Sequence, residues 1–208
     1  MNKLTATAAL ALLILAGCDS APRTTTGPDL TQEQRNQAAR ERQTIWWVID
    51  KDGNKTTNLA DDQPDVTAVR KVVALHSNTV DNRDHRTITE HADDEYGYYH
   101  PVFAEELRAK NYTGQLVSLY TAHQLRTHQT NLAWYTSTFP QDLTTAKVDI
   151  DVEFQFDEAT AAYLAANQLA LATPYVQHRT ISLAKTGNRW TITKIDKSPL
   201  TRRPTTPG

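Results

Sequence analysis

The run of residues 147–156 restricts how this chain folds more than any other feature, because apolar and polar residues alternate in it without interruption. The apolar positions are Val148, Ile150, Val152, Phe154 and Phe156, and the polar positions are Lys147, Asp149, Asp151, Glu153 and Gln155. Successive side chains of a β-strand point to opposite faces of its sheet, so each set shares one face. The pattern predicts a strand with one buried face and one wet, acidic face, which is typical of an antiparallel sheet.

Helical patterns precede this strand. Apolar residues recur at helical spacing after Asp65, which we expect to cap a helix, and Pro101 is expected in the first turn of a helix over residues 102–110. Residues 87–99 predict a further helical stretch, interrupted by Gly97. The very polar residues 77–86 either continue the first helix as a solvated face or end it.

Further extended segments surround the alternating strand. They are residues 115–127, 131–139, 175–185 and 189–196, with a short helix expected within residues 157–173 and a tight turn over residues 185–188. Helices followed by a run of long antiparallel strands predict an α+β domain, with N-terminal helices packed on a curved antiparallel sheet. We expect this domain to cover residues 65–197.

The segments outside this domain are expected to be peripheral. Residues 18–43 predict a flexible tether followed by a short helix. Residues 44–64 contain a Trp-Trp pair and an Asp-Gly turn signal, which predict a strand or hairpin extension packed on the domain. Residues 198–208 contain three prolines and two arginines, which predict a disordered tail.

The chain begins with the pattern of an export signal. Lys3 precedes a short apolar stretch, residues 6–16, which is too short for the roughly 20 residues that span a bilayer. The stretch ends in Leu15-Ala16-Gly17-Cys18, and this ending resembles the lipobox of bacterial lipoproteins. The same residues also fit an ordinary secretory signal followed by a stray cysteine.

The lipoprotein resemblance implies a location. In that family the signal peptide, here residues 1–17, is removed and the thiol of the new first residue, here Cys18, carries acyl chains such as palmitate. The protein is then anchored by lipid to the extracytoplasmic face of the cell membrane, as part of the cell envelope. Two or more acyl chains are enough for stable anchoring without a membrane-spanning helix.

Charge and cysteine content exclude several classes. The formal net charge is −2, and losing Lys3 with the signal peptide makes it −3, which argues against a nucleic-acid partner. Cys18 is the only cysteine, so the domain needs a packed core instead of disulfides. Export also separates the chain from cytosolic cofactors, and we expect none.

A second resemblance concerns the domain. Its order of helices and strands, together with a terminal Gly187-Asn188-Arg189-Trp190 turn followed by Ile192, resembles the nuclear transport factor 2-like cone fold. Exported actinobacterial lipoproteins carry similar terminal strands. The resemblance covers about residues 65–197 and implies a cone-type sheet whose interior is either filled or open as a pocket.

Candidate chemical groups do not form a recognisable catalytic or metal-binding motif. His85 and His91 are six residues apart and His123 and His128 five apart, so neither pair shares a helix or strand face suited to a metal. Carboxylates on one strand face can do acid–base work or hold a cation, but the acidic face of residues 149–153 is read as a solvated surface.

Aromatic residues are the candidates for a pocket. Tyr98, Tyr99, Tyr120 and Trp134 are expected either to pack in the core or to line the interior of the cone. Enzymes of the cone family, such as ketosteroid isomerases, use a carboxylate and tyrosine or acid donors in that place, but the spacing of Asp93, Asp94 and Glu95 here does not match a catalytic pattern.

We therefore expect a non-enzymatic, lipid-anchored binding or assembly module of the cell envelope, with an envelope protein as its partner. The alternative is a small-molecule-binding or enzymatic cone-fold protein with an interior pocket. A closed interior favours the module, and an open pocket with a buried carboxylate favours the enzyme.

Overall fold

The computed structural model describes residues 44–203. The predictions for the signal peptide, for Cys18, for the tether and for residues 204–208 lie outside the described residues. The helices are α2 (Pro64–Asp81), α3 (Ile88–His91), the 3-10 helix η1 (Asp94–Tyr98), α4 (Pro101–Ala109), α5 (Tyr112–His123) and α6 (Ala161–Asn167). The strands are β1 (Trp46–Ile49), β2 (Lys55–Leu59), β3 (Arg83–Asp84), β4 (Arg126–Trp134), β5 (Ser137–Pro140), β6 (Thr145–Glu158), β7 (Tyr175–Thr186), β8 (Arg189–Lys197) and β9 (Thr201–Arg202).

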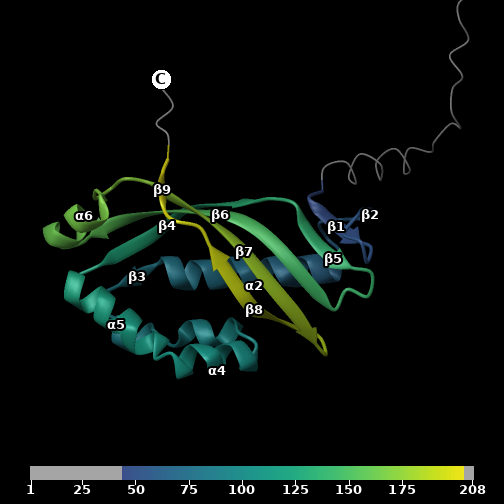
Figure 1. Ribbon diagram of the computed structural model, residues 1–208, viewed down its shortest axis with the longest axis horizontal. Coiled ribbons are helices and arrows are strands. Elements are labelled where there is room, and N and C mark those ends of the chain that lie inside the picture. The colour runs from purple at the N-terminus through teal and green to yellow at the C-terminus, as the bar shows by residue number, and fades with distance from the viewer. Residues whose placement is uncertain (1–43, 204–208) are drawn as a thin grey trace, which may run out of the picture.

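Strand β6 is the centre of a single nine-stranded sheet. It pairs antiparallel with β4 and β5 on one edge and with β7 on the other, and β7 in turn pairs with β8 and β9. In Figure 1 the long strands β6 and β7 arch over α2, and α4 and α5 lie on the same side of the sheet. This arrangement confirms the predicted α+β class, with N-terminal helices packed on a curved, mainly antiparallel sheet.

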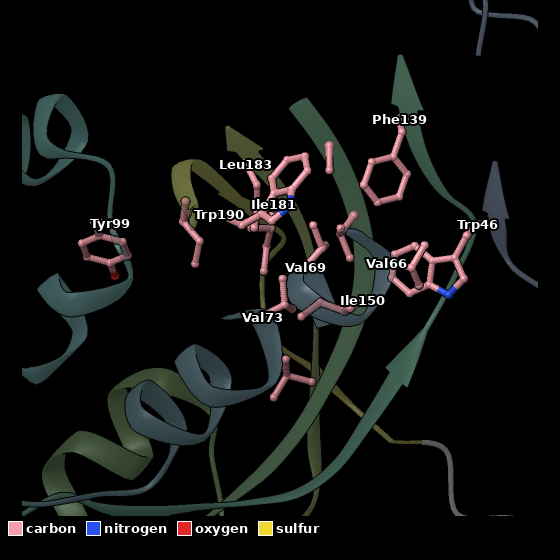
Figure 2. Close-up of a cluster of buried hydrophobic side chains, with 14 of the residues drawn as sticks. Trp46, Val66, Val69, Val73, Tyr99, Phe139, Ile150, Ile181, Leu183 and Trp190 are labelled. Carbon is pink, nitrogen blue, oxygen red and sulfur yellow. The ribbon is translucent and has the colours of Figure 1, made fainter. Parts of the chain in front are cut away.

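The core forms between α2 and the concave face of the sheet. The apolar set of β6 is buried at every predicted position, and Val66, Val69 and Val73 of α2 are fully buried against it. Figure 2 shows these valines facing Ile150, Ile181 and Leu183 of the sheet, with aromatic residues on either side. The alternation along residues 147–156 is thus confirmed as the basis of the core.

The N-terminal hairpin belongs to the same sheet. Strands β1 and β2 pair antiparallel, as the Asp-Gly signal predicts, and β1 also pairs parallel with β5. Trp46 is buried, with its ring centroid 6.1 Å from that of Phe139 and its Nε1 donating to Asp61 at 3.0 Å. The hairpin therefore extends the sheet and closes one end of the core.

The prediction that residues 115–127 are extended is wrong. They form most of α5, and the following strand starts only at Arg126. Leu116 and Tyr120, four residues apart, face one side of this helix and pack in a second buried cluster with Ile88 and Leu125. The prediction of an extended segment rested on residue types that favour strands. The helix forms because it places Leu116 and Tyr120 together on the buried side.

The first helix starts and ends differently from the prediction. Gln63, not Asp65, caps α2, because its side chain accepts from the backbone N–H of Val66 at 2.8 Å. Asp65 instead accepts from Trp190 Nε1 at 2.9 Å and pairs with Lys185 at 2.6 Å. The helix continues to Asp81, and these last residues are not a solvated face, since Ser77, Val80 and Asp81 are buried.

The predicted disordered tail is partly ordered. Residues Thr201–Arg202 form β9 against β7, and Arg203 pairs with Glu153 at 2.5 Å. Glu153 is consequently buried, with 8% of its surface exposed, so the acidic face of β6 is not wet along its whole length. No helix within residues 44–203 is long and apolar enough to cross a membrane.

Candidate functional site

A group of charged and hydroxyl side chains lies inside the fold, between α2, η1 and α5. Its centre is an ion pair in which Arg83 Nη2 lies 2.5 Å from Glu95 Oε1, and both side chains are at most 7% exposed. The second carboxylate oxygen of Glu95 accepts from the hydroxyl of Tyr99, and the hydroxyl of Tyr112 lies 3.5 Å away. The Glu95 carboxylate is therefore surrounded by donors from three elements. We call Arg83, Glu95, Tyr99, Tyr112 and His76 the buried network.

His76 extends this network into α2. Its Nε2 lies 3.0 Å from the Tyr99 hydroxyl, and the residue is fully buried. Because the single Tyr99 hydroxyl proton goes to Glu95, His76 must donate from Nε2. Its Nδ1 then carries a lone pair, and this atom has no hydrogen-bond partner within residues 44–203. Burial, followed by the positive charges of Lys197, Arg179 and Arg83, lowers the pKa of His76 well below its ordinary value.

A second buried ion pair ties the sheet to the end of α2. Arg179 of β7 binds Asp81 through two parallel bonds, Nη1–Oδ2 at 2.8 Å and Nη2–Oδ1 at 2.6 Å. The side chains are 3% and 5% exposed. Arg179 also donates from Nε to Gln177 at 3.0 Å. Such bidentate geometry satisfies both charges and fixes the relative position of the two elements.

The surroundings of Arg83, Tyr99 and Tyr112 shift the pKa of each of these three groups upward. Desolvation lowers the pKa of Arg83, but the Glu95 charge, together with Tyr112 and Tyr120, outweighs it and raises the pKa above its ordinary value. Burial and then the Glu95 charge raise the pKa of Tyr99, and the same causes raise that of Tyr112 to about 12. A general acid or base works best with a pKa near the working pH, and these shifts move the three groups away from it.

The four aromatic residues expected to pack or to line a pocket lie in separate places. Tyr98 contacts the His76 ring edge-on at 6.0 Å, next to buried Tyr99. Tyr120 lies in the second cluster, with its hydroxyl 3.2 Å from Thr127 Oγ1. Trp134 packs on Trp46, with ring centroids 5.9 Å apart. The fold brings together only Tyr98 and Tyr99.

Two hollows border the buried network. One, of about 280 Å³, is lined by Asn78, Thr79, Asn82, Arg83, Asp84, Thr87, Ile88, His91 and Asp94. The other, of about 270 Å³, is lined by Tyr99, His100, Pro101, Thr186, Arg189 and Thr191. Glu95 lines neither. Both are slightly smaller than the roughly 300–1,000 Å³ of typical small-molecule sites.

The acidic face of β6 is a set of local pairs. Asp151 accepts from the Tyr135 hydroxyl at 2.7 Å and lies 2.9 Å from His178 Nδ1, and Asp149 accepts from the Thr180 hydroxyl at 2.5 Å. Within residues 44–203 we find no group of three or more His, Cys, Asp or Glu side chains that could hold a metal ion. The carboxylates on this face thus have protein partners of their own.

The buried charges could not be recognised from the sequence. Asp81, Arg83 and Glu95 lie in very polar segments, and such segments predict a solvated surface or a loop. One signal was available, because Val69, Val73, His76, Ser77 and Val80 continue the helical spacing of the buried face into the segment that contains Asp81. The partner of Asp81 lies 98 residues away, and no local pattern indicates it.

Comparisons with known proteins give only distant likenesses. No protein-family model and no curated protein matches this chain. It is similar to an IcmL-like type IV secretion system protein from Legionella pneumophila, with a TM-score of 0.48 and 6% identity over 67% of this chain and 96% of the other. It is also similar to the Agrobacterium tumefaciens VirB8 protein, with a TM-score of 0.39 and 10% identity over 70% of this chain and 97% of the other.

A third solved structure, the intermembrane space region of the chloroplast protein ARC6, has a TM-score of 0.38 and 12% identity, over 63% of this chain and 94% of the other. Likenesses at this level carry no conclusion about what this chain binds or does.

Proposed function

We propose that this chain is a lipid-anchored, extracytoplasmic binding or assembly module of a bacterial cell envelope, and that it is not an enzyme. The observation that carries the location is the single cysteine, Cys18, at the end of a short apolar export signal and in a Leu-Ala-Gly-Cys context. Lipid on this residue holds the α+β domain at the membrane surface, where a protein partner meets it.

The structure of the interior supports a binding module over an enzyme. Within residues 44–203 the buried carboxylates are Asp81, Glu95 and Glu153, and each has an arginine partner at 2.5–2.8 Å. Apolar side chains of α2 and of the sheet pack against one another on the concave face. A substrate that used Asp81 or Glu95 would have to displace a buried ion pair, which costs about 3–5 kcal/mol. Binding at the outer surface needs no such rearrangement.

The lipid anchor is tested by changing the cysteine. In cells that produce the full chain and are fed an alkyne analogue of palmitate, the wild type should take up label and Cys18→Ser should not, because only a thiol forms the thioether. The double variant Cys18→Ser/Ser20→Cys moves the thiol two residues away and is the matched control. Labelling of either variant at the wild-type level would contradict the proposal.

The alternative, an interior pocket for a small molecule, is tested by thermal shift. A ligand present at 100 times its dissociation constant adds about 2.7 kcal/mol to the free energy of unfolding. For a domain of this size that is a rise of several degrees in the melting temperature. We expect no such rise for the mature chain with steroid-like or lipid-like compounds, and a reproducible rise would favour the pocket.

A further inference from the structure

A pocket lies where the start of α4 meets the hairpin between β7 and β8. Its lining residues come from both sides: Tyr99, His100 and Pro101 from the chain entering α4, and Thr186, Arg189 and Thr191 from the hairpin. The backbone N–H of His100 donates to the carbonyl of Ile192 at 2.8 Å, and Tyr99 forms a parallel bridge with the same residue. These bonds join the two walls, so the pocket is already formed in the free protein.

The buried network makes one wall rigid. The ring of Tyr99 is 5.0 Å from that of Phe103, and its hydroxyl is held by Glu95 and His76. On the opposite wall, Thr191 is buried and its hydroxyl donates to the carbonyl of Ala184 at 3.4 Å. The interior side chains of the pocket therefore have their own partners and need none from a ligand.

The volume of the pocket limits the size of the group that can bind in it. About 270 Å³ is enough for one large apolar side chain and falls below the typical range of drug-sized ligands. Interfaces between proteins are commonly organised around such an anchor, in which one side chain fills a preformed pocket. Val102, the residue after Pro101 on α4, is 62% exposed and adds an apolar surface beside the entrance.

The charge at the pocket entrance indicates which residue type of a partner would lie beside the apolar side chain. Arg189 is exposed, and its Nη2 donates to the carbonyl of Gly97 at 2.6 Å, which fixes the guanidinium over the pocket edge. No aspartate or glutamate lines the pocket. On a chain with a net charge of −2, an entrance that carries only positive charge favours an acidic partner.

We propose that this pocket binds an acidic segment of a partner protein, with an apolar side chain in the pocket and an adjacent carboxylate on Arg189. This inference rests on the proposed function as a binding module and names its contact surface.

The test uses a random library of nine-residue peptides, selected on the mature chain, residues 18–208, held in detergent. We expect enriched peptides to carry Leu, Ile or Phe next to Asp or Glu. One enriched peptide, made synthetically, should lose at least about tenfold in affinity on Arg189→Glu. Its counterpart with Lys in place of the acid should bind Arg189→Glu more tightly than the wild type.

Two further variants complete the test. Arg202→Glu makes the same charge change at an exposed arginine that lines a different pocket, and it should leave the affinity unchanged. Thr186→Trp fills the pocket from an exposed strand position without changing charge, and it should abolish binding. Circular dichroism and the melting temperature show that each variant is folded.

Three outcomes would overturn the pocket proposal: a selection that enriches no peptide, peptides without the acidic and apolar pair, or equal affinity loss for Arg189→Glu and Arg202→Glu. If peptides bind but ignore Arg189, the chain remains a binding module with its contact surface elsewhere. Failure of the Cys18 labelling, in contrast, would remove the lipid anchor and leave the peptide result standing.

Discussion

His76 should make the stability of this protein depend on pH in a way that one substitution removes. The residue is fully buried and its pKa lies well below the ordinary value of 6.5, so it stays neutral in the folded state, whereas the unfolded chain binds a proton below pH 6.5. Stability from this residue is therefore present above pH 6.5 and is lost as the pH falls toward the folded-state pKa. The limiting slope is about 1.4 kcal/mol per pH unit.

The unfolded-state titration sets the upper limit of the expected loss. Between pH 7 and pH 5 the unfolded chain gains about 2 kcal/mol from protonating this one imidazole. The measurement is urea unfolding of the wild type and of His76→Gln, whose side-chain amide keeps a donor for Tyr99, at pH 7 and pH 5. The wild type should lose up to about 2 kcal/mol more than the variant over this interval.

Other ionisable groups also titrate in this range, so the comparison needs a matched histidine. His123 is partly exposed and packs on Tyr163 with ring centroids 4.7 Å apart, so His123→Gln removes an imidazole without touching the buried network. This control shows whether the loss of a histidine outside the buried network also changes the pH dependence. Equal losses for the wild type and His76→Gln would refute the argument that His76 is held neutral by burial.

Two further predictions concern stability. Ile150→Asp places an unpaired charge on the fully buried face of β6 and should unfold the domain. Asp151→Asn, on the opposite face, should change the free energy of unfolding by about 1 kcal/mol or less in urea denaturation, because its contacts with Tyr135 and His178 are exposed. Asp81→Asn should cost about 3–5 kcal/mol because it leaves the buried charge of Arg179 without a carboxylate. The double variant Asp81→Leu/Arg179→Met should recover most of that loss. Comparable losses for Ile150→Asp and Asp151→Asn, or a double variant as unstable as Asp81→Asn, would contradict these accounts.

The sheet was predictable because its signals are local. Residues 147–156 alternate strictly, the turn at residues 185–188 contains a glycine with positive φ, and Pro101 occupies the first turn of α4. Each of these depends on neighbouring residues only, and each appears in the structure where expected. The failure at α5 has the opposite cause, since its residues favour either state and contacts with Ile88 and Leu125 decide for the helix.

The buried charges could not be predicted, since their partners are far apart in the sequence. Arg83 and Glu95 lie 12 residues apart and read locally as surface, and Asp81 meets Arg179 only once β7 has been placed over α2. A polar segment of a sequence does not indicate whether its charged side chains face water or pair with one another, because this depends on the tertiary structure. The same reasoning explains why Glu153 is buried, because the cover comes from Arg203 in a tail that composition marks as disordered.

Tyr99 links the interior to the proposed contact surface. Its hydroxyl joins Glu95, the partner of Arg83, to His76, and the same residue lines the pocket beside Arg189. A binding pocket gains affinity when its walls need no ordering on contact, because that ordering costs free energy. The ion pair between Arg83 and Glu95 holds this wall in place through the bond from Tyr99 to Glu95. The buried ion pair therefore gives the proposed binding surface a fixed shape.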